Sequence, residues 1–311
     1  MIKFQNVTKI YYNESGKGHP SVALENVSFE IKSGEFVSIV GKSGAGKTTL
    51  TRLILGLEKA TSGNVFFEEK NIQPISYRPF DNRYVIYNTK ILQRARESIM
   101  KNMLQRNIAL VTSKQLSTNE FSHVFVTDTV CDRCLISLQT REVSYIFPLR
   151  IYNNDAKQED LFESDKKIPD LNFSTKLWEY LEANCEVGPT ALPEDIFCYI
   201  YAVLYSNVYR KKYQEFLKID FPRIPFVKSL NTFKALAQLG EQLVNLHLLK
   251  SRELNNPIAK FSGKSENENR VEKREFNNGK VFINDHQFFE NIKPEIWNYN
   301  IGGYQVLDKW L

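Results

Sequence analysis

The chain is poor in cysteine, histidine and tryptophan, and it has no long apolar run. Its 311 residues include only 4 cysteines, 4 histidines and 3 tryptophans. The most apolar stretch, residues 196–205, is much shorter than the roughly 20 residues that a membrane-spanning helix needs. The N-terminal region also lacks the apolar core of a secretory signal. The sequence therefore predicts no membrane span, and we expect a cytoplasmic protein.

The scarcity of cysteine and histidine also limits the metal chemistry that the chain can support. Cys131 and Cys134 have the C-x-x-C spacing of zinc and redox sites. The other two cysteines, Cys185 and Cys198, are too far apart in sequence to complete a zinc ribbon. No histidine cluster compensates, because the histidines are scattered at His19, His123, His247 and His286. We expect reduced structural thiols and no zinc, with a metal site as the alternative, and packing or surface roles for the histidines.

No strong excess of either charge is present. The net charge is +5, the charged fraction is 25% and the apolar fraction is 42%, which are ordinary values for a globular protein. The length allows two or three domains. A nucleic-acid partner is permitted by this composition, but it would require a local basic patch.

A complete phosphate-binding loop lies near the N-terminus. Residues 41–48 (GKSGAGKT) match G-x-x-x-x-G-K-[ST]. The apolar run 35–40 before the loop predicts a buried strand, and residues 48–55 after it predict a helix. In such a loop Lys47 reaches the β- and γ-phosphates of a nucleotide, and the Thr48 hydroxyl binds Mg²⁺. A glycine-rich turn without a ligand is the alternative.

The segments around this loop resemble ABC-type ATPases, most of all the cell-division ABC ATPases. The resemblance covers about residues 1–72 and includes residues 4–11 (FQNVTKIY), 23–31 (ALENVSFEI) and 58–65 (EKATSGNV). It implies that Tyr11 stacks on adenine, although a half-buried tyrosine at a strand end would look the same. The implied ATP-binding residues are Tyr11, Gly41, Ser43, Gly44, Gly46, Lys47, Thr48 and Thr49.

The other motifs of that family are missing. The chain has no glutamine loop, no signature sequence and no switch histidine. The nearest candidate for the catalytic acidic strand is residues 124–128 (VFVTD), but Thr129 follows where a glutamate is needed, so Asp128 is interpreted as the end of an unrelated strand. Phosphoryl transfer depends on positioning and charge stabilisation. We therefore expect weak binding of ATP and Mg²⁺ at best, without useful hydrolysis.

After residue 72 the sequence changes character. Alternating apolar residues predict strands at residues 84–87, 108–112, 123–127 and 143–147, with one helix over 94–104. A polar stretch over 153–175 predicts a solvated connection. Helices are predicted over 193–208, over 209–217 and from Ser229 onward. Beyond them we expect a loop over 250–278 and strands at 281–283 and 296–299.

This second part resembles the C-terminal specificity domain of type ISP restriction–modification enzymes. The motifs stand in the family's order at residues 77–83 (YRPFDNR), 147–149 (FPL), 193–202 (PEDIFCYIYA), 220–225 (DFPRIP) and 299–304 (YNIGGY). The resemblance spans about residues 73–311 and implies a domain that recognises double-stranded DNA for an adenine methyltransferase and a translocating nuclease. No motif of those catalytic parts is found in the chain, so methyl transfer is not expected from it alone.

The candidate DNA-contacting residues are chosen by chemical type and by position. Arg and Lys suit guanine or phosphate, and Gln suits adenine. The candidates lie after the second predicted strand, between the third and fourth, and in a short basic cluster: Lys114, Gln115, Arg133, Gln139, Arg141, Arg210, Lys211 and Lys212. A solvated surface position is the alternative for each. The flanking arginines of the YRPFDNR motif are interpreted as an internal salt-bridge device, and Tyr199, Tyr201 and Tyr205 as helix core.

The predicted fold class is α/β plus α. A partial, β-rich P-loop fragment (1–72) precedes a specificity domain with an α/β lobe (73–152), a polar linker (153–175) and a mainly helical lobe (176–311). The leading hypothesis is a DNA-recognition module without its methyltransferase, helicase or nuclease parts. The alternatives are an ATP-binding ABC subunit with a divergent tail, and a misjoined gene without a unified function.

Overall fold

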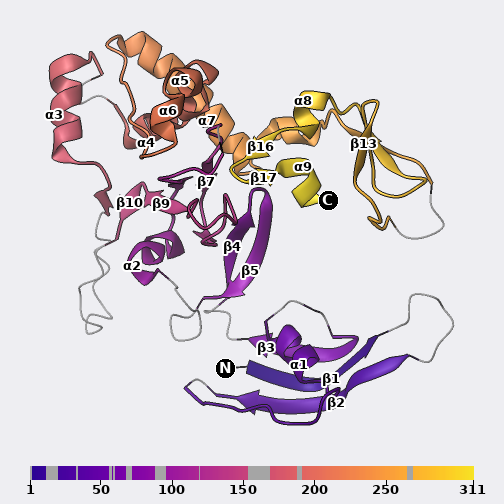
Figure 1. The fold of residues 1–311 in the computed structure, drawn as a ribbon. Helices are drawn as coiled ribbons and strands as arrows, with labels where there is room; N and C mark the ends of the chain where they lie inside the picture. Colours follow the sequence, from indigo (N-terminus) through magenta and orange to yellow (C-terminus); the bar gives the residue numbers. More distant parts are fainter. Residues whose placement is uncertain are drawn as a thin grey trace. The chain divides into compact units, whose positions relative to one another are not determined.

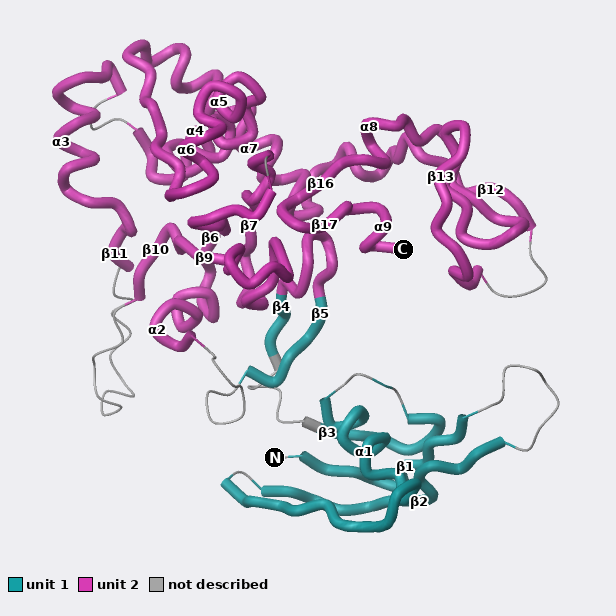
Figure 2. The backbone as a smooth tube through the Cα atoms, viewed as in Figure 1, with its two compact units in different colours: residues 1–75, 83–95 teal, residues 76–82, 96–311 magenta. Residues whose placement is uncertain are grey.

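The structure of the chain is a computed structural model that divides into two compact units (Figures 1 and 2). Unit 1 comprises residues 1–75 and 83–95, and unit 2 comprises residues 76–82 and 96–311. The described residues are 2–11, 20–32, 34–55, 58, 60–67, 72–87, 96–118, 120–152, 169–187, 191–264 and 269–311. His19, the start of the predicted helix over 94–104 and most of the predicted linker fall outside these ranges.

Unit 1 is built on an antiparallel sheet of order β2-β1-β3, formed by β1 (Ile2–Tyr11), β2 (Ser21–Ile31) and β3 (Ser62–Phe67). Helix α1 (Lys47–Ile54) confirms the predicted helix after the glycine loop. The core is small. Its buried side chains are Phe4, Val7, Leu24 and Leu53, and Phe4 stacks on Phe29 with 4.6 Å between ring centroids.

The predicted strand over residues 35–40 is not formed, so this prediction was wrong. Phe36 is 98% exposed and Val40 is 86% exposed. A strand needs neighbours that satisfy its backbone and cover its side chains. Among the described residues, no strand pairs with this segment.

Unit 2 has its central sheet in the order β7-β6-β9, with all pairs antiparallel. The strands are β6 (Ala109–Thr112), β7 (Val124–Thr127) and β9 (Tyr145–Pro148), which confirms three of the predicted strands. All of β7 is buried, so its Val-Phe-Val run needs no alternation of apolar and polar residues. A second sheet has the order β5-β4-β8, with β4 at Ile72–Arg78, β5 at Asp81–Ile86 and β8 at Val130–Cys131. Of its hairpin, residues 76–82 belong to unit 2, and residues 72–75 and 83–86 belong to unit 1.

Short elements complete this part of unit 2. Helix α2 (Glu97–Met100) continues as a 3-10 helix, Lys101–Leu104, as predicted for this stretch. Strand β10 (Arg150–Ile151) pairs with β11 (Asp170–Leu171), which lies within the predicted linker.

The helices of unit 2 pack around α4 (Pro193–Tyr205) and α7 (Leu230–His247). Pro193 starts α4, and Glu194 and Asp195 stabilise the positive end of its dipole. The two helices meet closely at Gly240, where a Cβ would lie 1.9 Å from the Cys198 carbonyl oxygen. The remaining helices are α3 (Thr175–Asn184), α5 (Asn207–Lys212) and α6 (Gln214–Leu217).

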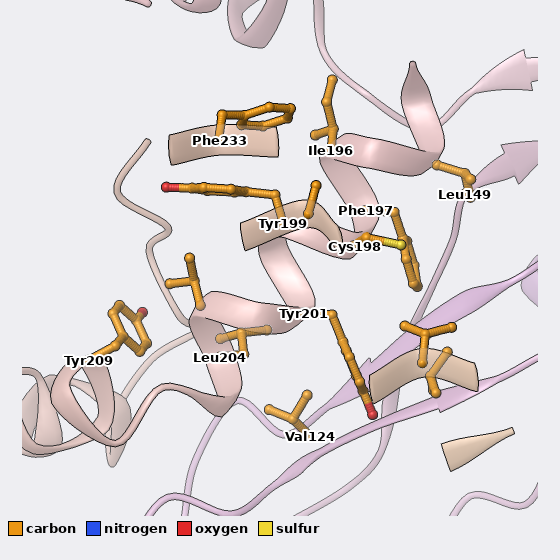
Figure 3. Close-up of a cluster of buried hydrophobic side chains, with 14 of the residues drawn as sticks. Val124, Leu149, Ile196, Phe197, Cys198, Tyr199, Tyr201, Leu204, Tyr209 and Phe233 are labelled. Atoms are coloured by element: carbon orange, nitrogen blue, oxygen red, sulfur yellow. The ribbon is translucent and has the colours of Figure 1, made fainter. Parts of the chain in front are cut away.

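The core around α4 is aromatic (Figure 3). Tyr199 stacks between Phe226 and Phe233 at centroid distances of 5.1 and 4.9 Å, and its hydroxyl donates to the Pro225 carbonyl. Tyr201 is also fully buried, and its hydroxyl lies 2.6 Å from Nδ1 of His247. The interpretation of these tyrosines as helix core is confirmed.

The C-terminal part of unit 2 differs most from the sequence prediction. The predicted loop over 250–278 contains a 3-10 helix and two strands, and the predicted strand at 296–299 is the end of a helix that Pro294 starts. A four-stranded sheet of order β12-β15-β14-β13 occurs here. The elements are the 3-10 helix Arg252–Asn255, β12 (Lys260–Ser262), β13 (Glu275–Asn277), β14 (Lys280–Phe282), β15 (Phe288–Glu290), α8 (Pro294–Trp297), β16 (Asn300–Ile301), β17 (Tyr304–Gln305) and α9 (Val306–Trp310).

The predicted helix over 193–208 ends earlier than expected. Ser206 is extended (φ −68°, ψ 121°), and its Oγ accepts a hydrogen bond from the Tyr209 amide, so that it caps α5. A serine prefers this capping position to a helix interior. Among the described residues, no helix combines the length and apolarity that crossing a bilayer would require.

Candidate nucleic-acid interface

The phosphate-binding loop of unit 1 is folded around its own lysine. Lys47 Nζ donates to the carbonyl oxygens of Gly41 (2.8 Å) and Lys42 (2.7 Å). Gly46 has φ +78°, and a Cβ there would lie 2.3 Å from the Ala23 carbonyl oxygen, so only glycine fits. Ser43, Gly44 and Thr48 are exposed, whereas Thr49 is buried. The loop and helix are therefore arranged as the motif predicts, without the preceding strand.

Tyr11 belongs to a polar cluster at the end of β1. Its hydroxyl donates to Glu58 Oε2 (2.6 Å) and lies 3.4 Å from Thr49 Oγ1. Lys9 and Arg52 also pair with Glu58. The hydrogen bond from Tyr11 is the main reason that the pKa of Glu58 is lowered. Tyr11 thus has a structural partner, and its stacking on adenine stays a prediction.

The C-x-x-C segment of unit 2 is anchored by an ion pair. Arg78, which is buried, lies 2.7 Å from Asp132 Oδ1, and this oxygen also accepts the Cys134 amide. The salt-bridge interpretation is therefore confirmed for Arg78. Burial raises the pKa of Cys131 to about 12, and all four cysteines are free thiols. Within the described ranges, no three side chains of the metal-ligating types come together.

The loop between β8 and β9 presents three of the candidate DNA-contacting residues. Arg133, Gln139 and Arg141 are exposed, and Leu138 beside them is 64% exposed. The neighbouring Glu142 is fully buried. The loop therefore exposes polar side chains, while its base, the segment that joins it to the strands, is buried.

Glu142 is the centre of a buried hydrogen-bond network at that base. Its Oε2 accepts from Ser137 Oγ (2.5 Å) and lies 2.9 Å from His123 Nε2, and its Oε1 accepts the Ser117 amide (2.6 Å). Burial alone would raise the pKa of Glu142, but these partners outweigh burial and lower the pKa. Burial lowers the pKa of His123 more strongly than Glu142 raises it. The network fixes the loop to the ends of β6 and β7.

The basic cluster of α5 splits into two kinds of residue. Arg210 packs inward, because its Nε donates to the Leu204 carbonyl (2.6 Å), its guanidinium lies 4.5 Å from the Tyr205 ring and its Nη2 is buried. Lys211 and Lys212 are exposed. The structure therefore gives Arg210 an internal packing role, and of the three basic residues of this cluster only the two lysines are exposed.

Lys114 and Gln115 are exposed after β6, and Lys114 lies near a group of aromatic rings that sequence reasoning missed. Phe221 makes edge-to-face contacts with Tyr145 (5.0 Å) and Phe147 (5.6 Å), and Lys114 Nζ lies 5.7 Å from its ring centroid. We call Tyr145, Phe147 and Phe221 the aromatic rim. The available signal was in β9, where apolar residues fall on both faces of the strand: Tyr145 and Phe147 are exposed, while Ile146 and Pro148 are buried.

A pocket of about 360 Å³ adjoins the aromatic rim. Phe147 and Phe221 are among its lining residues, together with side chains of β6 and α4 that include Leu110, Phe197 and Ile200. Its polar lining comes from Thr112 and Asn172. The pocket lies entirely within unit 2.

Comparison with known proteins identifies the family of most of the chain. The family model described as "Type ISP C-terminal specificity domain" matches residues 44–311. The chain belongs to this family. The matched region begins at residue 44, inside the phosphate-binding loop. The resemblance inferred from the sequence motifs begins later, at about residue 73.

Two solved structures have the same fold as most of this chain. The ATP-dependent type ISP enzyme LlaBIII bound to DNA superposes with a TM-score of 0.59 and 21% identity, over 78% of this chain and 15% of that chain. The DrdV–DNA complex gives a TM-score of 0.58 and 23% identity, over 78% of this chain and 23% of that chain. The mixed helix and sheet architecture is therefore that of the type ISP specificity domain.

The ABC-type resemblance is confirmed over a short stretch. The spermidine/putrescine import ATP-binding protein PotA of Mycoplasma capricolum is 41% identical over 75 residues. This alignment covers 24% of the chain and 19% of PotA. The chain thus spans about a fifth of the length of this curated relative.

Proposed function

We propose that the chain is a DNA target-recognition module of type ISP restriction–modification. The observation that carries this proposal is the specificity-domain match over residues 44–311. The likeness in fold to the DrdV–DNA complex and to LlaBIII bound to DNA supports it. The chain spans 23% of the DrdV chain and 15% of the LlaBIII chain. Methyltransferase, helicase and nuclease parts of a restriction–modification system would be its partners.

We further propose that the module keeps the organisation inferred from its sequence. An α/β lobe over 73–152 and a mainly helical lobe over 176–311 would flank the polar stretch 153–175, after the P-loop fragment 1–72. Double-stranded DNA would contact the exposed basic and amide side chains of both lobes.

The exposed loop before Glu142 is the best candidate for reading bases. Arg133 and Arg141 offer the forked donors that bind guanine, and Gln139 offers the amide that pairs with adenine. Hydrogen bonds to Glu142 hold the end of the loop in place, so the backbone that carries these side chains is anchored. Lys211 and Lys212 are better suited to phosphate contacts, which position a protein without reading sequence.

Fluorescence anisotropy with labelled duplex DNA is the direct test. We expect binding at about 50 mM salt that falls steeply towards about 200 mM, because phosphate contacts release counterions. Replacing both Lys211 and Lys212 by alanine should weaken binding to all sequences and reduce the salt slope by about 2. Lys176→Ala, an exposed lysine on α3, is the matched control. Absence of binding at low salt would contradict the proposal.

Selection from a random duplex pool tests base reading. Arg133→Ala and Arg141→Ala should each relax the preference at one position, by about 1–3 kcal/mol. Unchanged sequence preferences in both variants would show that another part of the chain reads the bases.

A second, weaker activity concerns unit 1. We propose that the loop 41–48 binds ATP with Mg²⁺ weakly, through Lys47 and Thr48, without hydrolysis. The intact loop–helix geometry favours binding, whereas the exposed segment 35–40 leaves the loop without its supporting strand. Fluorescent-ATP titration should give weak binding that Lys47→Ala removes. Phosphate release that depends on Mg²⁺ and on Lys47 would contradict the absence of hydrolysis.

A further inference from the structure

The pocket beside the aromatic rim has the composition of a site for a flat, partly polar ring. Its volume of about 360 Å³ is at the small end of the range for ligand sites, about 300–1,000 Å³. Most of its walls are apolar side chains, and four of them, Phe147, Phe173, Phe197 and Phe221, are aromatic rings. Tyr145 and Phe147 are 43% and 39% exposed, so the rim offers aromatic surface on which another ring can stack.

The polar lining of the pocket includes two acceptors. Thr112 Oγ1 donates its hydrogen to the His123 carbonyl (2.8 Å), so only its lone pairs remain for a ligand. Asn172 Nδ2 donates one of its two N–H groups to the Pro148 carbonyl (2.8 Å), which leaves its second N–H as a donor and its Oδ1 as an acceptor. Two acceptors in an apolar pocket match a ligand that carries an amino group.

Positive charge lies next to the rim. The Lys114 side chain is 48% exposed and lies over Phe221, with Asp220 3.9 Å from its Nζ. The Leu116 amide donates to the Lys218 carbonyl (3.0 Å), which ties the segment after β6 to the one that carries Phe221. Arg223 is exposed on the same segment, with its guanidinium 4.8 Å from the Phe216 ring. Cations beside exposed aromatic rings are the arrangement that binds unpaired nucleotides, with the cation on the phosphate and the ring stacked on the base.

We propose that this pocket receives a nucleobase displaced from the DNA duplex, preferentially adenine, cytosine or guanine rather than thymine. These bases carry the exocyclic amino group that Thr112 and Asn172 would accept, while Phe147 and Phe221 stack on the ring. Lys114 would bind the adjoining phosphate. This inference rests on the DNA-binding function proposed above and adds a second mode of contact, distinct from reading base edges in a groove.

The test uses the full chain and duplexes that are identical except for one position. Displacing a base costs less when it is already unpaired. A duplex with a single unpaired adenine or cytosine should therefore bind more tightly than the fully paired duplex, by about tenfold. An unpaired thymine, which has no amino group, should give a smaller gain.

Variants of the rim decide whether the pocket is responsible. Phe221→Ala combined with Phe147→Ala should remove the gain for unpaired bases and leave affinity for paired duplex within about twofold. Phe221→Leu keeps an apolar side chain and folding but removes stacking, so it should lose most of the gain. Phe261→Ala, a 44% exposed aromatic on β12, is the control and should keep the gain.

The outcomes separate this inference from the function on which it rests. Equal affinity for paired and unpaired duplexes, or a gain that survives in the rim variants, would overturn the pocket assignment while DNA binding stands. An equal gain for thymine would overturn the preference for an amino group. Loss of binding to every duplex in the unmodified chain would instead overturn the proposed function.

Discussion

The two units treat similar apolar runs in opposite ways. In unit 1, residues 35–40 form no strand, and Phe36 and Val40 are almost fully exposed. In unit 2, β7 has a run of the same character and is buried on both faces, with Val124 and Val126 at 0% exposure. The difference lies in the neighbours: β6 pairs with β7 and α4 covers it, whereas no described strand pairs with residues 35–40. An apolar run specifies a strand only where other elements complete its surroundings.

The largest effect is expected in the core of unit 2. Tyr199→Ala removes a ring that stacks on two others and a hydroxyl that hydrogen-bonds to the Pro225 carbonyl and the Val227 amide. We expect a loss of about 4 kcal/mol in the free energy of unfolding, measured by urea denaturation followed by circular dichroism. Val208→Ala, at a 78% exposed valine of α5 in the same unit, is the control and should change stability by less than about 0.5 kcal/mol.

Acid should destabilise unit 2 through His247. Burial lowers the pKa of His247 to about 4, from an ordinary value near 6.5. The unfolded chain therefore binds a proton that the folded chain excludes, so stability is complete above about pH 6.5 and falls as the pH drops towards 4. The loss from this residue is about 3 kcal/mol.

His247→Gln provides the comparison for this pH effect. Its side-chain oxygen can accept the Tyr201 hydroxyl but cannot take up the proton. Urea denaturation between pH 4 and 7 should show a shallower pH dependence in the variant. Parallel curves for the two proteins would mean that other groups cause the acid sensitivity.

A smaller loss is expected from the network that holds the candidate base-reading loop. Glu142→Gln replaces one of the two carboxylate oxygens by an amide NH₂ group, which donates instead of accepting. Ser117, or Ser137 together with His123, would then face a donor in place of an acceptor. The free energy of unfolding at pH 7, measured by urea denaturation, should fall by about 2 kcal/mol. Glu182→Gln, an exposed glutamate on α3, should have little effect. Equal stability of both variants would show that the network does not support the loop.

The smallest effect is expected where unit 1 leaves its apolar run uncovered. Phe36→Ala removes a side chain that is 98% exposed. The free energy of unfolding, measured by thermal denaturation, should therefore change by less than about 0.5 kcal/mol. This prediction tests the comparison between the units directly. A loss as large as that of Tyr199→Ala would mean that residues 35–40 are packed against other groups in solution.

Local signals predicted the elements that depend mainly on their own residues. Helix α4 begins at Pro193 with acids in its first turn, and α7 follows the i, i+3, i+4 spacing of its apolar side chains, so both could be read from the chain. The glycine loop and α1 were predictable for the same reason. The aromatic rim was not, because Phe221 and β9 are far apart in sequence and no local pattern brings them together.

The sequence by itself determined the family of the chain, through ordered motifs, and the positions of its main helices, through spacing and capping. Only the tertiary structure decided which apolar residues are buried, since burial requires a partner surface that the local sequence does not contain. It turned Arg210 inward beneath Tyr205, left Arg133, Gln139 and Arg141 exposed around a buried carboxylate, and joined three distant rings beside a pocket. These features depend on contacts between segments that are remote along the chain, which is why packing determined them.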